Sequence, residues 1–198
     1  MHPFIKSCSL LLAIMLLPAC DAFKGPSEAE QIERTIRQEV NANKRGLEAL
    51  MQVAATTPYD GFAWRRGEPL QIRQRTEQGM ILLDEATAPE IISTAVKFNV
   101  PSFSIVRYQQ GWLVVFRYYL TEHCQAVYAY AYHGVLPETP QCSADLFAEQ
   151  ANGQCQTPIN TEWQVFKEWF FAQSLADEGN PICQEKAAAG WQAVGQQP

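Results

Sequence analysis

The sequence lacks several features that mark common classes of protein. Beyond residue 21 it contains no apolar run long enough to cross a bilayer as a helix. Positive charge is in deficit: the net charge is −6, and loss of Lys6 with the leader described below makes it −7. An acidic chain of this kind is a poor ligand for nucleic acid, so we expect no nucleic-acid partner.

Catalytic and metal-binding motifs are also missing. No G-x-S-x-G, H-E-x-x-H, P-loop or dinucleotide fingerprint occurs, and no paired cysteines with nearby histidines have a zinc-binding spacing. A Cys124–His133 dyad is excluded on a strand, because nine extended residues span about 30 Å. His123 is next to Cys124, but neighbouring side chains on a strand point in opposite directions. We therefore predict no catalytic residue, no metal and no cofactor.

The first 21 residues carry an export signal. Lys6 precedes an apolar run from Leu10 to Leu17, and small residues then lead to Cys20. The end of this run, Leu17-Pro18-Ala19-Cys20, resembles the lipobox of bacterial lipoproteins. That resemblance implies cleavage before Cys20, a diacylglycerol on its sulfur and usually an acyl chain such as palmitate on its new amino group. The alternative is an ordinary signal peptide that leaves Cys20 as a spare thiol.

A lipidated chain would be held at a bacterial membrane. Burial of acyl chains contributes about 0.8 kcal/mol per methylene, and two chains anchor a protein stably. Asp21, after the acceptor cysteine, resembles the signal that retains enteric lipoproteins in the inner membrane. We expect residues 1–19 to be the signal peptide, 20–26 a lipidated N-terminus with a short linker, and 27–198 one periplasmic domain, at the inner membrane rather than the outer.

Four cysteines remain once Cys8 leaves with the signal and Cys20 is lipidated. An even number in an exported chain predicts two disulfides. The four are Cys124, Cys142, Cys155 and Cys183. Three pairings are possible and the sequence does not choose among them. We favour Cys142 with Cys155, which would brace the irregular segment 136–158, and Cys124 with Cys183, which would tie the C-terminal tail to the sheet.

A long amphipathic helix is predicted from Ser27 to about Ala55. Ser27 and Glu30 have the spacing of a capping box, and Gly46 marks a position for a bend. Apolar residues recur at helical spacing: Ile32, Ile36, Val40, Leu47, Leu50, Met51 and Ala54. We favour packing of this helix on its own sheet; the alternative is a helix that binds a partner or lies on a membrane.

The middle of the chain is predicted to form an antiparallel sheet. Two runs that flank Gln78-Gly79 indicate a hairpin, and a short helix with Thr87 as its cap follows. Segment 102–133 contains three aromatic and β-branched runs, with turns at Gln110-Gly111 and around Glu122-His123. A two-residue turn at Gln110-Gly111 pairs Gln109 with Trp112 and assigns every side chain to a face.

That register gives the strands two different faces. One face is apolar and suits a core: Phe103, Ile105, Trp112, Val114, Phe116, Tyr118, Val127, Ala129 and Ala131. The other, the tyrosine face, carries Ser102, Ser104, Val106, Tyr108, Leu113, Val115, Arg117, Tyr119, Tyr128, Tyr130 and Tyr132. Tyrosine and arginine are enriched at interfaces. We therefore predict partner binding through Arg117, Tyr119, Tyr128, Tyr130 and Tyr132. The alternatives are ordinary cross-strand packing and cover by the C-terminal segment.

A second amphipathic helix is predicted between Thr161 and Gly179, with Thr161 and Gln164 as its capping box. Its apolar stripe contains Trp163, Phe166, Trp169, Phe170 and Ser174. A short basic segment nearer the N-terminus contains Arg65, Arg66, Arg73 and Arg75. This segment would either rest on anionic head groups or form a solvated face.

Together these inferences predict an α+β domain, in which an antiparallel sheet meander is packed by N-terminal and C-terminal amphipathic helices and braced by disulfides. The expected function is non-catalytic protein binding in the cell envelope, as an accessory subunit of an assembly or as an immunity-type inhibitor. The alternatives are an envelope hydrolase and a lipid-binding or tether module. The expected partners are the membrane, through the N-terminal lipid, and an envelope protein.

Overall fold

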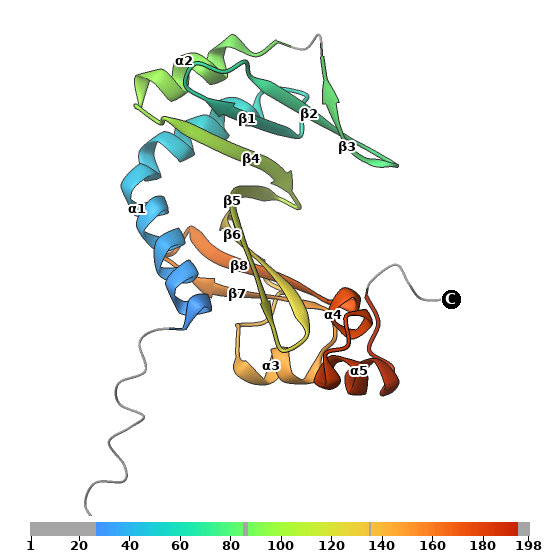
Figure 1. Ribbon diagram of the computed structural model, residues 1–198. Coiled ribbons are helices and arrows are strands. Elements are labelled where there is room, and N and C mark those ends of the chain that lie inside the picture. The colour runs from blue at the N-terminus through green and yellow to red at the C-terminus, as the bar shows by residue number, and fades with distance from the viewer. Residues whose placement is uncertain (1–26, 85–86, 135, 194–198) are drawn as a thin grey trace, which may run out of the picture.

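One long helix and an eight-stranded antiparallel sheet make up most of the fold (Figure 1). The computed structural model describes residues 27–84, 87–134 and 136–193, so the predicted signal peptide, lipidation site and linker lie outside the described residues. The elements are α1 (Glu28–Ala55), β1 (Gly61–Arg65), β2 (Gln71–Thr76), β3 (Gly79–Leu83), α2 (Pro89–Lys97), β4 (Ser102–Tyr108), β5 (Gly111–Glu122), β6 (Gln125–His133), α3 (Ala144–Glu149), β7 (Gly153–Pro158), β8 (Trp163–Phe171), α4 (Gln173–Asp177) and α5 (Pro181–Ala188). The strand order is β3-β2-β1-β4-β5-β6-β8-β7. The predicted α+β class is confirmed.

Helix α1 begins and ends where the sequence predicted. The Ser27 hydroxyl accepts the N–H of Glu30 at 3.2 Å, and the Glu30 carboxylate accepts the N–H of Ser27 at 2.8 Å, which completes the capping box. The predicted apolar positions from Ile36 to Ala54 are buried against the sheet. Gly46 lets α1 lie close to the segment before β4, because a Cβ there would collide with the Val100 side chain. No described helix has the length and hydropathy needed to span a bilayer.

The turns of the sheet differ slightly from those predicted. Pairing of Thr76 with Gly79 places the first turn at Glu77-Gln78, and α2 has Ala88 rather than Thr87 as its N-cap, without a side-chain hydrogen bond. The β4–β5 turn is Gln109-Gln110, so Trp112 pairs with Arg107 instead of Gln109. Because the partner changes by two residues, the described side chains of β4 and β5 keep their predicted faces.

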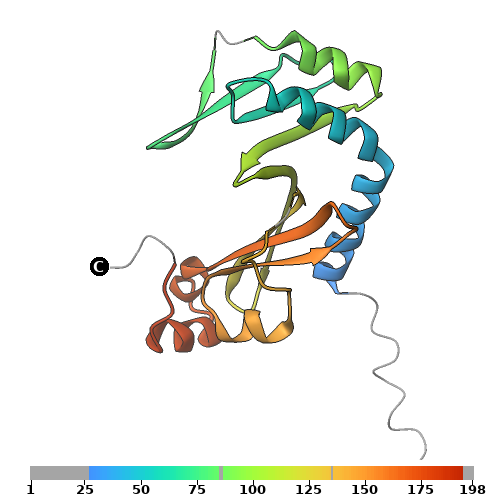
Figure 2. The same cartoon turned by 180° about the vertical axis from the view of Figure 1, so that it is seen from behind.

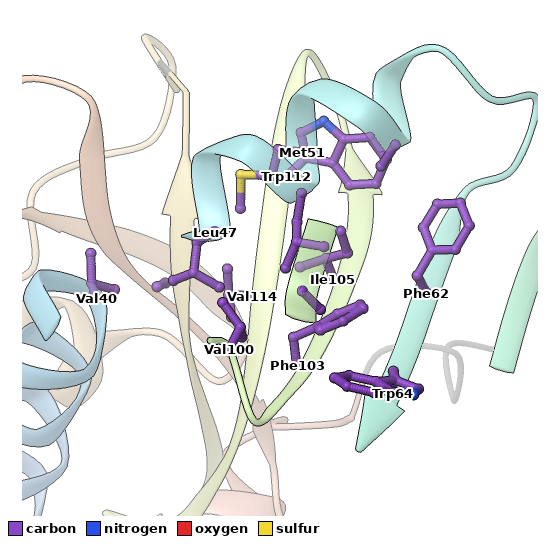
Figure 3. Packing of buried hydrophobic residues seen from close by; sticks show 14 of the residues in the cluster. Val40, Leu47, Met51, Phe62, Trp64, Val100, Phe103, Ile105, Trp112 and Val114 are labelled. Atoms are coloured by element: carbon purple, nitrogen blue, oxygen red, sulfur yellow. The ribbon is translucent and has the colours of Figure 1, made fainter. Parts of the chain in front are cut away.

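The predicted core face packs against α1. Ile105, Trp112 and Val114 are buried, and Leu47 and Met51 of α1 approach them from the helix side (Figure 3). Small side chains at Ala129 and Ala131 let α1 lie close to β6, and both residues are buried in the same cluster.

The predicted C-terminal helix is wrong. Residues 163–171 form β8, which pairs with β6 on one side and β7 on the other. Trp163, Val165 and Trp169 are buried, while Phe166 is buried on the opposite face. A strand with apolar residues on both faces can imitate the spacing of a helical stripe, and its aromatic content favours a strand. The helices after β8 are the short α4 and α5.

Both favoured disulfide pairings are confirmed. Cys142 is bonded to Cys155, 13 residues away, and fastens the segment before α3 to β7. Cys124 is bonded to Cys183, 59 residues away, and fastens α5 to the β5–β6 turn.

The sheet divides into two arms that share α1 (Figures 1 and 2). The N-terminal arm contains β1 to β4 with α2, and the C-terminal arm contains β5 to β8 with α3 to α5. The first turns of α1 pack on the C-terminal arm through Ala29 and Ile32, near Trp169. The later turns pack against α2 of the N-terminal arm. Between β4 and β5, the ladder covers only the pairs from Tyr108–Gly111 to Ile105–Val114.

Candidate functional site

The tyrosine face lies on the side of the sheet turned away from α1. Tyr119 of β5 and Tyr128 of β6 are directly opposite each other, with 5.3 Å between ring centroids. Tyr119 is 55% exposed and Tyr128 is 36% exposed. These two rings are the most accessible of the predicted site residues that the structure describes.

Tyr130 extends this pair along β6. It is half-buried, and its ring centroid lies 6.2 Å from that of Phe166. Burial, with smaller contributions from Glu168 and Tyr128, raises the pKa of Tyr130 to about 12. Its phenol is therefore a neutral hydrogen-bond donor and acceptor at any physiological pH.

Tyr132 is not part of the exposed surface, which corrects the prediction for this residue. It is fully buried with Leu113, Leu136 and Phe166. Its hydroxyl donates to the carbonyl of Tyr108 at 3.5 Å. The chain that follows β6 returns over this end of the sheet and places Leu136 on the ring, a tertiary contact that a strand pattern does not reveal. The Arg117 side chain lies outside the described residues.

Strand β8 adds side chains to this face that the sequence analysis had assigned to a helix. Glu168 pairs directly with Tyr128 across the β6–β8 ladder, and Phe170 lies 6.4 Å from the Tyr128 ring. We call Tyr119, Tyr128, Tyr130, Glu168 and Phe170 the aromatic patch. Glu168 and Phe170 could have been assigned to this face from the sequence only by the alternation of side chains along β8, which requires that the segment be interpreted as a strand.

Glu168 is the charged member of the aromatic patch. Burial raises its pKa, and the amide of Gln154 offsets this in part by donating to the carboxylate at 3.4 Å. The same amide also donates to the Tyr108 hydroxyl at 3.2 Å. A shallow hollow of about 390 Å³ lies beside the carboxylate, lined by Asn152, Gly153, Gln154, Glu168 and Phe170. The aromatic patch therefore combines exposed rings, a half-buried acid and a small recess.

The residues considered for catalysis do not come together. Cys124 is held in its disulfide and carries no free thiol. His123 is exposed beside Glu122 at 3.5 Å, whereas His133, at the other end of β6, packs on the Trp163 ring at 4.9 Å. Within the described ranges, no three histidine, cysteine or acidic side chains are grouped closely enough to hold a metal ion.

A larger cavity, of about 620 Å³, lies where β4 and β5 separate. Residues from α1, β1, β2, β4 and β5 line it, and they include Leu47, Trp64, Ser102, Ser104 and Val115. Arg65 and Arg73 of the basic segment also line it. The sequence analysis did not predict this cavity.

The basic segment has few acidic partners. Arg65 lies 3.7 Å from Glu68, both exposed, and this is the one ion pair of the segment among the described side chains. Arg66 donates to the Asn99 side chain, Arg73 to that of Gln71, and Arg75 to the carbonyl of Arg107. Glu39 and Glu68 line the cavity as well as Arg65 and Arg73, so the charges of its lining side chains balance.

Comparisons of this chain with protein-family models, with curated proteins and with solved structures found no match.

Proposed function

We propose that this chain is a lipid-anchored periplasmic protein of the bacterial envelope that acts by binding another protein through the aromatic patch. The observation that carries the proposal is the exposed Tyr119–Tyr128 pair, on a sheet face that no described helix covers. Tyrosines contribute large, rigid contact area together with a hydroxyl, which is why they are frequent in interface hot spots.

The half-buried acid supports the same proposal. Burial raises the pKa of Glu168, so the ionised carboxylate lowers the stability of the free domain. Local features that oppose stability are expected at functional sites. Glu168 would accept hydrogen bonds from a partner and would become better satisfied in the complex than in the free domain.

The proposed anchor would hold the aromatic patch close to a membrane. The chain enters α1 at the C-terminal arm, which carries the aromatic patch (Figure 1). An extended linker of about six residues between Cys20 and α1 reaches roughly 20 Å. An accessory subunit of an envelope assembly and an immunity-type inhibitor would both use a binding surface placed in this way.

Replacement of the proposed lipid acceptor tests the anchor. Cys20→Ala is expected to release the protein from membranes, because acyl chains supply the proposed attachment. The measurement is the distribution of the full chain between membrane and soluble fractions after alkaline and high-salt washing. Retention of the Cys20→Ala protein in the membrane fraction would contradict a lipid anchor.

Substitution of Tyr128 tests the binding surface. Tyr128→Ala is expected to weaken binding by about 2 kcal/mol or more, roughly thirtyfold, with little change in melting temperature. The binding partner is first isolated by cross-linking and pull-down from detergent-solubilised membranes, and its affinity is then measured for each variant.

Tyr132→Ala is the matched control, since it removes the same side chain four residues away on the same strand but from a fully buried position. It is expected to lower the free energy of unfolding by about 3 kcal/mol or more. An unchanged affinity for the Tyr128→Ala protein would place the binding surface elsewhere.

A further inference from the structure

The carboxylate of Glu168 has no cationic partner among the described side chains. Gln154 of β7 donates to it at 3.4 Å, and Tyr128 is its cross-strand neighbour on β6. The adjacent Lys167 lies on the opposite face of β8 and pairs with Glu33 at 3.2 Å. Within the described part of the chain, the aromatic patch therefore holds a half-buried acid whose charge is not neutralised.

The side-chain amides that line the hollow beside Glu168 are already engaged as donors. The Gln154 amide donates to the Glu168 carboxylate and to the Tyr108 hydroxyl, which uses both of its hydrogens. The Asn152 amide donates to a backbone carbonyl at 2.7 Å, and its oxygen accepts a backbone N–H at 3.0 Å. The carboxylate and the Gln154 carbonyl oxygen can still accept hydrogen bonds. A donating cation fits these groups, whereas an anion would be repelled by the carboxylate.

Aromatic rings stand beside the same carboxylate. Tyr128 is directly opposite Glu168, and the Phe170 ring lies 6.4 Å from the Tyr128 ring. Tyr119 packs on Tyr128 from β5, with 5.3 Å between centroids, and stays accessible to solvent. The face of an aromatic ring attracts a cation, and the attraction grows where water is excluded. A cation bound at Glu168 would therefore be stabilised by the rings as well as by the acid.

Arginine suits these surroundings better than lysine does. Its guanidinium is planar, so it can stack on a ring while its N–H groups donate to a carboxylate. The ammonium of lysine is a strongly hydrated point charge that would have to lose water beside a half-buried group. The hollow of about 390 Å³ has both Glu168 and Phe170 in its wall, so a side chain that entered it would meet the acid and a ring together.

We propose that the aromatic patch receives an arginine side chain of its partner protein, which pairs with Glu168 and stacks on the ring of Tyr128 or Phe170. This inference rests on the proposed function, because it names the chemistry by which the aromatic patch would recognise that partner. The arginine supplies the positive charge and the donors that the described surroundings of Glu168 lack. The net charge of −6 on the chain also favours the approach of a basic partner surface.

Selection from a peptide library provides the probe. The full chain, purified in detergent, is used to select binders from a displayed library of random dodecapeptides. The expected consensus contains an invariant arginine beside apolar or aromatic residues. The consensus peptide is synthesised together with an analogue in which citrulline replaces this arginine, which keeps the shape of the side chain and removes its charge. The citrulline peptide is expected to bind about tenfold more weakly.

Glu168→Gln and Glu149→Gln form a matched pair of variants. Both remove one negative charge, but Glu149 is exposed on α3, which packs on the opposite face of the sheet through Leu146 and Phe147. Glu168→Gln is expected to weaken binding of the arginine peptide about tenfold and to leave the affinity for the citrulline peptide unchanged. Its melting temperature is expected to stay the same or rise, since burial opposes the ionised carboxylate. Glu149→Gln is expected to bind both peptides as the wild type does.

The proposal is overturned if no peptide is enriched or if the consensus lacks arginine. Equal affinity for the arginine and citrulline peptides would overturn it too, as would equal affinity of the wild type and Glu168→Gln for the arginine peptide. Arg117→Gln tests a competitor within the chain. If this variant binds the arginine peptide about tenfold more tightly than the wild type, the chain's own Arg117 occupies the acid and the proposal is wrong.

The isolated envelope partner separates this inference from the proposed function. If the partner binds Tyr128→Ala weakly but binds Glu168→Gln as tightly as the wild type, the aromatic patch is the binding surface and only the arginine contact is overturned. If the partner binds both variants as the wild type does, the proposed function is overturned as well.

Discussion

Replacing Cys124 and Cys183 together by alanine is expected to lower the free energy of unfolding by about 4 kcal/mol. This disulfide closes the longer of the two loops, with the cysteines 59 residues apart, and long loops gain most from closure in the chain-entropy model. It also holds α5 against the β5–β6 turn, where Cys124 and Cys183 are both buried beside Phe171. Urea denaturation of both proteins without reductant measures the difference.

The second disulfide is the internal control. Removal of the Cys142–Cys155 disulfide, whose cysteines are 13 residues apart, is expected to cost about 3 kcal/mol. An equal loss for both pairs, or a larger loss for the shorter loop, would contradict loop closure as the main source of the effect.

Trp169→Ala is expected to destabilise the domain by about 4 kcal/mol, since it removes a fully buried aromatic side chain. The Trp169 ring packs on Phe147 of α3, with 4.4 Å between centroids, and its indole N–H donates to the carbonyl of Gln150 at 3.1 Å. A Cβ at Gly153 would collide with this ring, so the close packing of β7 on Trp169 requires glycine at this position. Thermal and urea unfolding measure the loss.

Phe170→Ala is the comparison for Trp169. Phe170 is the next residue of β8 and lies half-buried on the aromatic patch, so its removal is expected to cost clearly less stability. If the two substitutions cost the same, the assignment of Trp169 to the core and Phe170 to the surface would be contradicted.

Local signals predicted the parts of the fold that are determined locally. The capping box of Ser27 and Glu30 identified the start of α1, because its hydrogen bonds join residues only three apart. The turn between β4 and β5 was predicted one residue too late, but the predicted faces of these strands were still correct. The pairing partner changed by two residues, and side chains alternate with the same period. The cysteine count predicted two disulfides, and the pairing that we favoured among three possible ones is the pairing formed.

Non-local contacts explain what the sequence did not predict. Trp163, Phe166 and Trp169 fit a helical stripe, and only pairing with β6 and β7 makes their segment a strand. That error removed Glu168 and Phe170 from the predicted site. Tyr132 has the same pattern as Tyr130 but is covered by Leu136. The cavity between β4 and β5 arises because β5 leaves β4 beyond Val114, and no short-range pattern marks that departure.

Helix α1 packs on both arms and holds them at a fixed separation. Its 28 residues extend about 42 Å, and its first and last turns are buried against different arms. The arms cannot swing apart about the short β4–β5 ladder without bending this helix or exposing apolar surface. The width of the cavity between the arms is therefore fixed by α1. A ligand that entered this cavity would not need the arms to move, so its binding is expected to require little rearrangement of the domain.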